Sequence, residues 1–274
     1  MRVTLRGTRG SVGRAGAGTV RYGGDTSSAE VVASDGTPLL LDAGSGIVHC
    51  LPDGHGDPLH VLLTHLHMDH IQGLGFFRAL FDPTVEVHLW GPISGRSLTD
   101  RLARYLSPPL FPVRLRDLPA TVVHDLVPGT VEIGPFRVTA DFVIHPGQTY
   151  GYRIEGDGRV LTYMPDHEPA LGAGRIPSDT RWLSGYELAK GADLLVHDGQ
   201  YTDEEYKTRV GWGHSTIDQS VEFARTSGVG RIVTDHHEPD PSDEEIDRLH
   251  EEVRSRHSGG PAVIAGLADA TFEV

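Results

Sequence analysis

Four potential metal ligands follow directly on one short apolar segment. Residues 61–63 are apolar, and His65, His67, Asp69 and His70 come next. A buried strand that ends in three imidazoles and a carboxylate has no obvious packing role, whereas zinc and similar divalent ions prefer these ligands. Two histidines that are two residues apart on an extended segment point the same way. The pattern predicts a metal site at the end of this strand, and a surface histidine cluster is the alternative.

The rest of the chain alternates between strand-like and helix-like patterns. Residues 1–7 are predicted to form a first strand. Apolar or alternating runs bounded by glycine predict further strands at 29–33, 39–41, 60–63, 85–90, 136–144, 150–154, 160–163, 194–197, 231–234 and 262–265. Helical patterns appear at 73–81, 98–105, 184–190, 202–209, 216–227 and 242–256. The last helix has a start signal, because Ser242 and Glu245 form a capping box.

One domain is expected over residues 1–274, because no linker rich in proline, glycine or serine divides the chain. Predicted strands cluster early, and strands alternate with helices later. These patterns suggest an α/β (α+β) domain in which two sheets pack together with helices outside, a four-layer αββα sandwich. Periodicity alone supports only a mixed α and β protein.

The composition limits the partners of this protein. Its net charge of −14 argues against binding to long nucleic acid, which usually requires a basic stripe. A small anionic substrate remains compatible, because bound metal ions would make one pocket locally positive. No apolar run approaches the ~18–20 residues of a membrane span, and residues 1–7 lack the apolar stretch of a secretory signal. The single cysteine, Cys50, cannot form an internal disulfide, so we expect a cytoplasmic protein.

The sequence His-x-His-x-Asp-His after an apolar strand resembles the signature of the metallo-β-lactamase superfamily. Four further segments resemble the other motifs of the superfamily, in the same order along the chain: Asp42 in 40–44, His145 after 142–144, Asp166 in 163–166 and His236 after 232–235. The resemblance therefore extends over nearly the whole chain.

This resemblance implies a site for two divalent metal ions. The implied ligands are His65, His67 and His145 for one ion, and Asp69, His70 and His236 for the other. Asp166 would bridge the two ions, and Asp42 would orient one of the ligands. Zinc is the expected metal, and manganese or iron(II) would suit the same ligands.

Simpler roles remain as alternatives for several of these residues. A turn or loop position is the alternative for Asp42, His145 and Asp166. His167 is a rival ligand to its neighbour Asp166, and His237 is a rival to His236. We prefer His236, because it comes first after the strand, as in the superfamily pattern.

Another pair of residues resembles the phosphodiesterase branch of the superfamily. Asp198 ends the apolar run 194–197, and His214 opens the sequence His-Ser-Thr at a predicted helix start. In this branch, which includes tRNA 3′-processing endonucleases and phosphoribosyl cyclic phosphodiesterases, the acidic residue orients the histidine. That histidine lies near the scissile phosphate and helps to protonate the leaving oxygen. The alternative is that Ser215 or Thr216 caps the helix and His214 only packs.

The tRNA endonucleases carry a long arm between the third and fourth motifs, whereas His145 and Asp166 are only 21 residues apart. The extra length lies instead at about 81–126, where proline and apolar residues suggest an inserted lid or subunit contact. Related phosphodiesterases are often dimers, so the resemblance also implies a homodimer.

We therefore expect a dinuclear metal-dependent hydrolase that acts on a small or cyclic phosphodiester. Hydroxide held by the metals would attack phosphorus, His214 would assist the leaving oxygen, and Asp69 is a second candidate for proton transfer. A carbon-centred hydrolase, such as a lactonase, thioesterase or β-lactamase, is the main alternative. A non-catalytic metal-binding protein on the same fold is the third.

Overall fold

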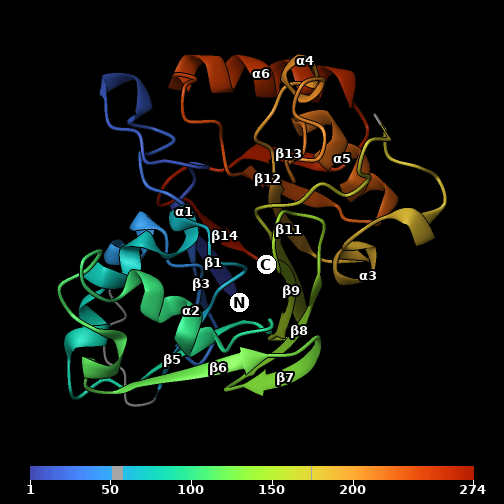
Figure 1. The fold of residues 1–274 in the computed structure, drawn as a ribbon. Coiled ribbons are helices and arrows are strands. Elements are labelled where there is room, and N and C mark those ends of the chain that lie inside the picture. Colours follow the sequence, from blue (N-terminus) through green and yellow to red (C-terminus); the bar gives the residue numbers. More distant parts are fainter. Residues whose placement is uncertain (51–57, 174) are drawn as a thin grey trace.

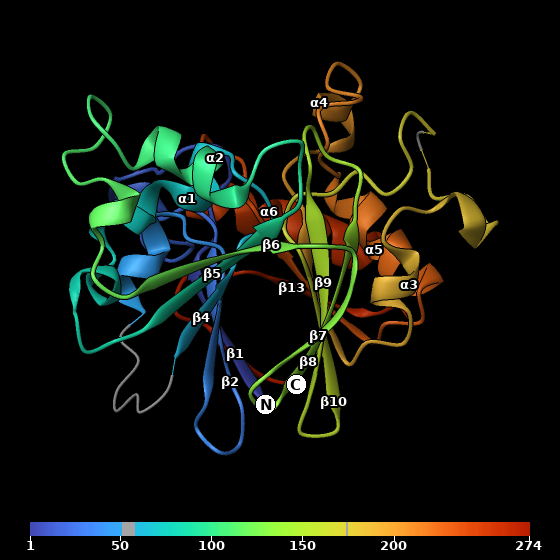
Figure 2. The same cartoon turned by 60° about the horizontal axis from the view of Figure 1, so that its bottom comes forward.

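The structure is a computed structural model that describes residues 1–50, 58–173 and 175–274. Within these residues, two seven-stranded sheets pack face to face, and helices cover their outer faces (Figures 1 and 2). Helices α1 and α2 lie outside the first sheet, and α3 and α5 lie outside the second (Figure 2). The predicted four-layer αββα sandwich is confirmed.

The first sheet has the strand order β14-β1-β2-β3-β4-β5-β6. Its strands are β1 (Arg2–Gly7), β2 (Ser28–Val32), β3 (Pro38–Leu41), β4 (Leu59–Leu62), β5 (Val87–Pro92), β6 (Thr121–Leu126) and β14 (Thr271–Glu273). Neighbours from β14 to β3 are antiparallel, whereas β3, β4, β5 and β6 run parallel. The sequence did not predict β6 or β14.

The second sheet has the order β13-β12-β11-β10-β9-β8-β7. Its strands are β7 (Gly129–Ile133), β8 (Phe136–Phe142), β9 (Tyr150–Gly156), β10 (Arg159–Met164), β11 (Leu194–Asp198), β12 (Arg231–Asp235) and β13 (Ala262–Ala265). The four strands from β10 to β13 run parallel, and the others are antiparallel. Strand β7 is a further element that the sequence did not predict.

Three apolar layers hold the sandwich together. The central layer lies between the sheets, where Leu5 packs in the same buried cluster as Phe136 and Tyr163. Outside the first sheet, α2 (Leu98–Tyr105) packs with α1 (Met68–Ile71). Outside the second sheet, the buried faces of the helices pack on β11, β12 and β13. These helices are α3 (Tyr186–Ala189), α5 (Ile217–Thr226) and α6 (Asp243–Arg256), and the short α4 (Asp203–Tyr206) precedes α5. Burial of apolar surface on both faces of each sheet is the main force that stabilises this arrangement.

The helix predicted at 73–81 is wrong. Helix α1 begins earlier, at Met68, and two 3-10 helical segments follow it, Gln72–Phe76 and Arg78–Phe81. Gly73 lies in the first of these segments, and a β-carbon there would lie 2.1 Å from the backbone oxygen of Gly44. The chain therefore passes another backbone segment at a position that only glycine permits.

The stretch 81–126, which we expected to be an insertion, includes strands β5 and β6 of the first sheet. These two strands are parallel neighbours, so a crossover must connect them, and residues 93–120 with α2 form that crossover. The lid or subunit-contact role thus remains a prediction for residues 93–120 alone.

Candidate metal centre

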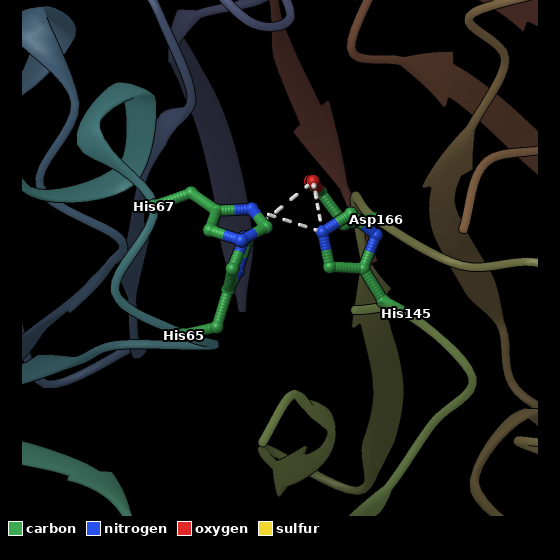
Figure 3. Close-up of side chains that lie close together, drawn as sticks. All are labelled: His65, His67, His145 and Asp166. Carbon is green, nitrogen blue, oxygen red and sulfur yellow. Dashed lines mark hydrogen bonds and ion pairs between the residues drawn. The ribbon is translucent and has the colours of Figure 1, made fainter. Parts of the chain in front are cut away.

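Most candidate ligands occupy loops that follow the carboxyl ends of strands, and Asp69 and His70 lie in the short helix α1 that comes after β4. His65 follows β4, Asp166 follows β10 and His236 follows β12, while His145 lies shortly after β8. Parallel neighbours in each sheet end at the same edge, and the packing of the two sheets brings these loops together (Figure 3).

One group consists of His65, His67, His145 and Asp166, whose potential ligand atoms all lie within 4.8 Å of one another. Nε2 of His145 lies 3.1 Å from Nδ1 of His67. Oδ2 of Asp166 lies 3.5 Å from Nε2 of His145 and 3.7 Å from Nε2 of His65 (Figure 3). The structure thus brings three imidazoles and one carboxylate oxygen to one point.

A second group consists of Asp69, His70 and His236. Oδ2 of Asp69 lies 3.6 Å from Nε2 of His70 and 3.7 Å from Nε2 of His236. The other oxygen of Asp166, Oδ1, lies 3.0 Å from Nε2 of His70 and 3.3 Å from Nδ1 of His236. The two oxygens of Asp166 therefore face different groups, as a bridging carboxylate would.

Several buried atoms of these groups have no hydrogen-bond partner among the described residues. They are Nε2 of His65, Nε2 of His70, Oδ1 of Asp166 and Nε2 of His236. Such orphaned polar atoms are unfavourable in a protein interior. Burial also lowers the pKa of His65 and of His236, so both imidazoles are neutral at neutral pH. Burial lowers the pKa of His70 as well, but the surrounding carboxylates, Asp166 first, outweigh this effect and raise it well above the ordinary value. The neutral nitrogens of His65 and His236 and the carboxylate of Asp166 are donors that a divalent cation would satisfy.

Asp42 contacts His70 of the second group through the ring nitrogen that faces away from the other members. Its fully buried carboxylate accepts hydrogen bonds from the backbone N of Thr64 at 2.7 Å and from Oγ1 of Thr64 at 2.9 Å. It also lies 2.9 Å from Nδ1 of His70. Donation from Nδ1 to this carboxylate leaves Nε2 of His70 directed toward the second group, and the orienting role of Asp42 stays a prediction.

The geometry also separates the rival residues. His237 donates from Nε2 to the backbone oxygen of Gly266 at 2.9 Å and packs on the ring of Tyr22, away from the cluster. His236 has φ 60°, a left-handed conformation, and its side chain lies inside the second group. Nδ1 of His167 lies 2.9 Å from Nε2 of His197, outside both groups. This arrangement favours His236 and Asp166 over their neighbours.

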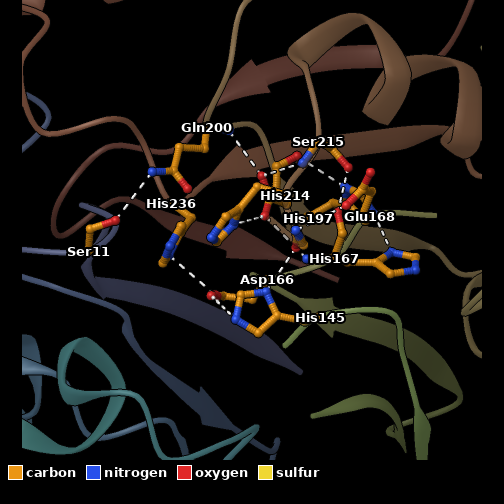
Figure 4. A network of polar contacts seen from close by, with 12 residues as sticks. Ser11, His145, Asp166, His167, Glu168, His197, Gln200, His214, Ser215 and His236 are labelled. Atoms are coloured by element: carbon orange, nitrogen blue, oxygen red, sulfur yellow. Dashed lines mark hydrogen bonds and ion pairs between the residues drawn. The ribbon is translucent and has the colours of Figure 1, made fainter. Parts of the chain in front are cut away.

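His214 is held by Asp198 and forms a third group of potential metal ligands with Asp166 and His236. Its Nδ1 lies 2.7 Å from Oδ2 of Asp198. Its ring stacks on that of His236 with centroids 5.0 Å apart (Figure 4). Burial lowers the pKa of His214, but the charge and hydrogen bond of Asp198 outweigh this effect and raise it. Oδ1 of Asp198 accepts from the backbone N of Ser215 at 3.1 Å. The cap of α5 is Thr216, as the alternative interpretation of this motif expected, and this finding does not by itself assign a role to His214.

Two hollows open on either side of Pro146, which lines both. The first has a volume of about 360 Å³, and its lining includes His65, His67, Arg101, Arg104 and Leu110. The second has a volume of about 390 Å³, and its lining includes His214, Gln200, Arg209 and Trp212. Arg101, Arg104 and Leu110 come from the crossover 93–120. The sequence analysis did not predict these lining residues. An arginine or tryptophan alone does not indicate a binding site, and only the fold shows that these side chains line a hollow.

Comparison with known proteins identifies the family. Residues 37–237 match the model of the beta-lactamase superfamily domain, so the chain belongs to this superfamily. Ribonuclease Z of Myxococcus xanthus (strain DK1622) is 29% identical over 269 residues, which cover 81% of this chain and 84% of that protein. The resemblance inferred from the motifs is confirmed.

Two solved structures share the fold over the whole chain. The metallo-beta-lactamase fold protein YhfI from Bacillus subtilis has a TM-score of 0.71 at 20% identity and covers 100% of this chain and 99% of its own. Zn²⁺-bound PqqB from Methylobacterium extorquens has a TM-score of 0.72 at 19% identity and covers 100% of both chains. Within the described residues, none of the helices has the length and apolar character needed to cross a membrane.

Proposed function

We propose that this chain is a metal-dependent phosphodiesterase that hydrolyses a small phosphodiester. The observation that carries the proposal is the position of His214, which Asp198 holds beside the two groups of metal-binding side chains. Carbonyl hydrolysis on such a metal site does not require this pair, whereas phosphodiester cleavage benefits from a proton donor to the leaving oxygen. The relative named ribonuclease Z supports the same class of reaction.

The proposed ligands are those that the sequence indicated, divided between the two groups and joined by Asp166. Histidine and carboxylate donors fit zinc best, with manganese and iron(II) as further candidates, and the PqqB structure was solved with Zn²⁺. Two such ions, when bound, would activate a water molecule and withdraw charge from the phosphoryl group.

Two side chains of this protein would transfer protons, and a third would position one of them. His214 is the proposed donor to the leaving oxygen, because Asp198 raises its pKa and keeps it protonated at neutral pH. Asp198 is a positioning residue, since its carboxylate fixes the ring through Nδ1 and leaves Nε2 free. Asp69 is the proposed acceptor for the proton of the attacking water, and the backbone N of Ser11 donates to its Oδ2 at 2.8 Å.

The proposed substrate is small because the chain offers little to grip a folded RNA. Residues 145–166 contain only the hairpin formed by β9 and β10, and the net charge is −14. Two positively charged side chains, Arg101 and Arg104, line the first hollow together with His65 and His67. They suit one anionic group close to the metal centre and not a long phosphate backbone.

A substrate panel tests this proposal. Purified protein with defined zinc or manganese would be offered bis(p-nitrophenyl) phosphate, a cyclic nucleotide, a precursor tRNA, a lactone and a thioester. We expect turnover of the small phosphodiesters. Hydrolysis of the lactone or thioester with every phosphodiester inert would contradict the reaction class. Preference for the precursor tRNA would contradict the proposal of a small substrate but would leave the proposed reaction class intact.

A further inference from the structure

The second hollow carries a large aromatic side chain that the proposed mechanism does not use. Trp212 lies at its rim, two residues before His214, and its side chain is 58% exposed. Exposure of a large apolar indole to water is energetically unfavourable. Aromatic side chains that line a hollow beside a reactive centre are common in ligand-binding sites. The residues discussed below that also line this hollow are Pro146, Tyr201, Arg209, Gly211, His214 and Glu238.

The loop that carries Trp212 is held in place by a buried carboxylate. Glu168 is only 1% exposed, and its oxygens accept hydrogen bonds from the backbone N of Gly211 at 3.1 Å and of Gly213 at 3.0 Å. The hydroxyl of Tyr206 donates to the same carboxylate at 2.6 Å. These bonds flank Trp212 on both sides, so the indole projects from a fixed backbone and not from a free loop.

Gly213 holds the same loop against the metal centre. Its φ is +89°, and a β-carbon there would lie 2.3 Å from Cδ of Pro146 and 2.6 Å from Nδ1 of His145. The backbone oxygen of Gly213 also lies 2.9 Å from Nδ1 of His145. The position of Trp212 is thus coupled to that of a proposed metal ligand.

The charges in this hollow favour a planar, uncharged group. The guanidinium of Arg209 lies 4.8 Å from the ring centroid of Tyr201 and 6.0 Å from that of Trp212. Its charge is balanced, because it lies 3.7 Å from Glu205 and 3.8 Å from Glu238. Arg209 therefore offers no free charge to an additional phosphate, and the other cation that lines the hollow, His214, is the proposed proton donor. An aromatic ring would find the indole face.

We propose that the leaving group of the substrate carries a planar aromatic ring, of the nucleobase type, that stacks on Trp212 in the second hollow. This inference rests on the proposed function, because His214 lines the same hollow and is the proposed donor to the leaving oxygen. The substrate class is then a diester whose leaving alcohol is a nucleoside. Trp212 determines specificity and takes no part in proton transfer.

Calorimetric titration of the zinc-loaded protein with two phosphomonoesters tests the inference without measuring turnover. Adenosine 5′-monophosphate carries the base, and ribose 5-phosphate lacks it. We expect the wild type to bind the nucleotide about tenfold more tightly, from one base–aromatic stack. Trp212→Ala should abolish most of this preference and leave ribose 5-phosphate binding unchanged, while Trp212→Phe should retain much of it.

Trp182→Ala is the matched control, because Trp182 is 76% exposed and does not line the hollow. It should leave the preference intact. Equal affinity of the wild type for both ligands, or a preference that survives Trp212→Ala, would overturn the inference. Hydrolysis of bis(p-nitrophenyl) phosphate, measured in parallel, decides the proposed function separately. If the protein prefers the nucleotide but cleaves no phosphodiester, the stacking site is supported and the proposed reaction is contradicted.

Discussion

Asp198 and His214 form a buried pair in which Oδ2 of the carboxylate lies 2.7 Å from Nδ1 of the imidazole. They come from different elements, because Asp198 ends β11 and His214 precedes α5. Backbone N–H groups of Gln200 and Ser215 donate to the other carboxylate oxygen at 3.0 and 3.1 Å. The carboxylate is therefore fixed independently of the histidine that it orients.

Asp198→Asn should lower phosphodiester turnover by roughly 10²-fold, within the usual range for loss of general acid–base catalysis. The amide oxygen can still accept from the two backbone N–H groups, but the charge that keeps His214 protonated is gone. Steady-state kinetics, with metal content measured on the same samples, checks this. Asp193→Asn, at the other end of the same strand region, is the control and should change neither. Unchanged turnover would remove the pair from the mechanism.

Asp42→Asn should weaken metal binding by about 10- to 100-fold, the usual effect of removing a residue that orients a ligand. The carboxylate accepts from Thr64 and His70, and an amide NH₂ would turn a donor toward these donors. Competition with a chromogenic chelator measures the metal affinity. Asp35→Asn provides the comparison, because Asp35 is exposed. Equal metal affinity of the Asp42 variant and the wild type would contradict the orienting role.

Arg104→Ala should raise KM for an anionic diester by up to about fivefold, because an exposed charge pair contributes little more than 1 kcal/mol. Turnover should stay near the wild-type value, and the difference should shrink as salt is added. Arg116→Ala is the control, since Arg116 belongs to the same crossover but does not line the first hollow. A loss of kcat with unchanged KM would argue against a binding role for Arg104.

Arg9→Ala should reduce the free energy of unfolding by about 3–5 kcal/mol, because it removes one partner from a buried charged network. Arg9 is fully buried, and its guanidinium lies 3.8 Å from the buried carboxylate of Asp243. It also donates to the backbone oxygens of Gly23, Glu238 and Pro241 at 3.0, 3.0 and 3.1 Å. Urea unfolding followed by circular dichroism gives the value. Arg14→Ala, at an exposed position, should reduce the free energy of unfolding far less. Similar reductions for both variants would contradict the stabilising role of the Arg9 contacts.

The parts of the fold that depend on local pattern could be predicted from sequence. Helix α2 begins and ends where its apolar spacing indicated, and the capping box at Ser242 opens α6 as expected. Strands β6, β7 and β14 were missed. Strand β14 pairs with β1 across nearly the whole chain, and β6 (Thr-Val-Val-His-Asp-Leu) has neither a regular alternation nor a continuous apolar run.

The candidate site, like the fold, has features that could be predicted from sequence and features that could not. Ligand types and order were visible in sequence, because imidazoles and carboxylates follow apolar strands. The division of the two oxygens of Asp166 between two groups was not visible, since it depends on the packing of both sheets. Trp212 and Glu168 gave no sequence signal either, because their relation arises only when the loop after α4 meets the loop after β10.

Metal titration of chelator-stripped protein is the most direct test of the central claim that these side chains form a two-ion phosphodiesterase site. Bound zinc and turnover of bis(p-nitrophenyl) phosphate would be measured on the same samples. The account predicts negligible turnover without metal and recovery that is complete at about two bound ions per chain, with Asp166→Ala impaired in both measurements. Turnover that survives removal of the metal, or saturation of turnover and binding at a single ion, would contradict it.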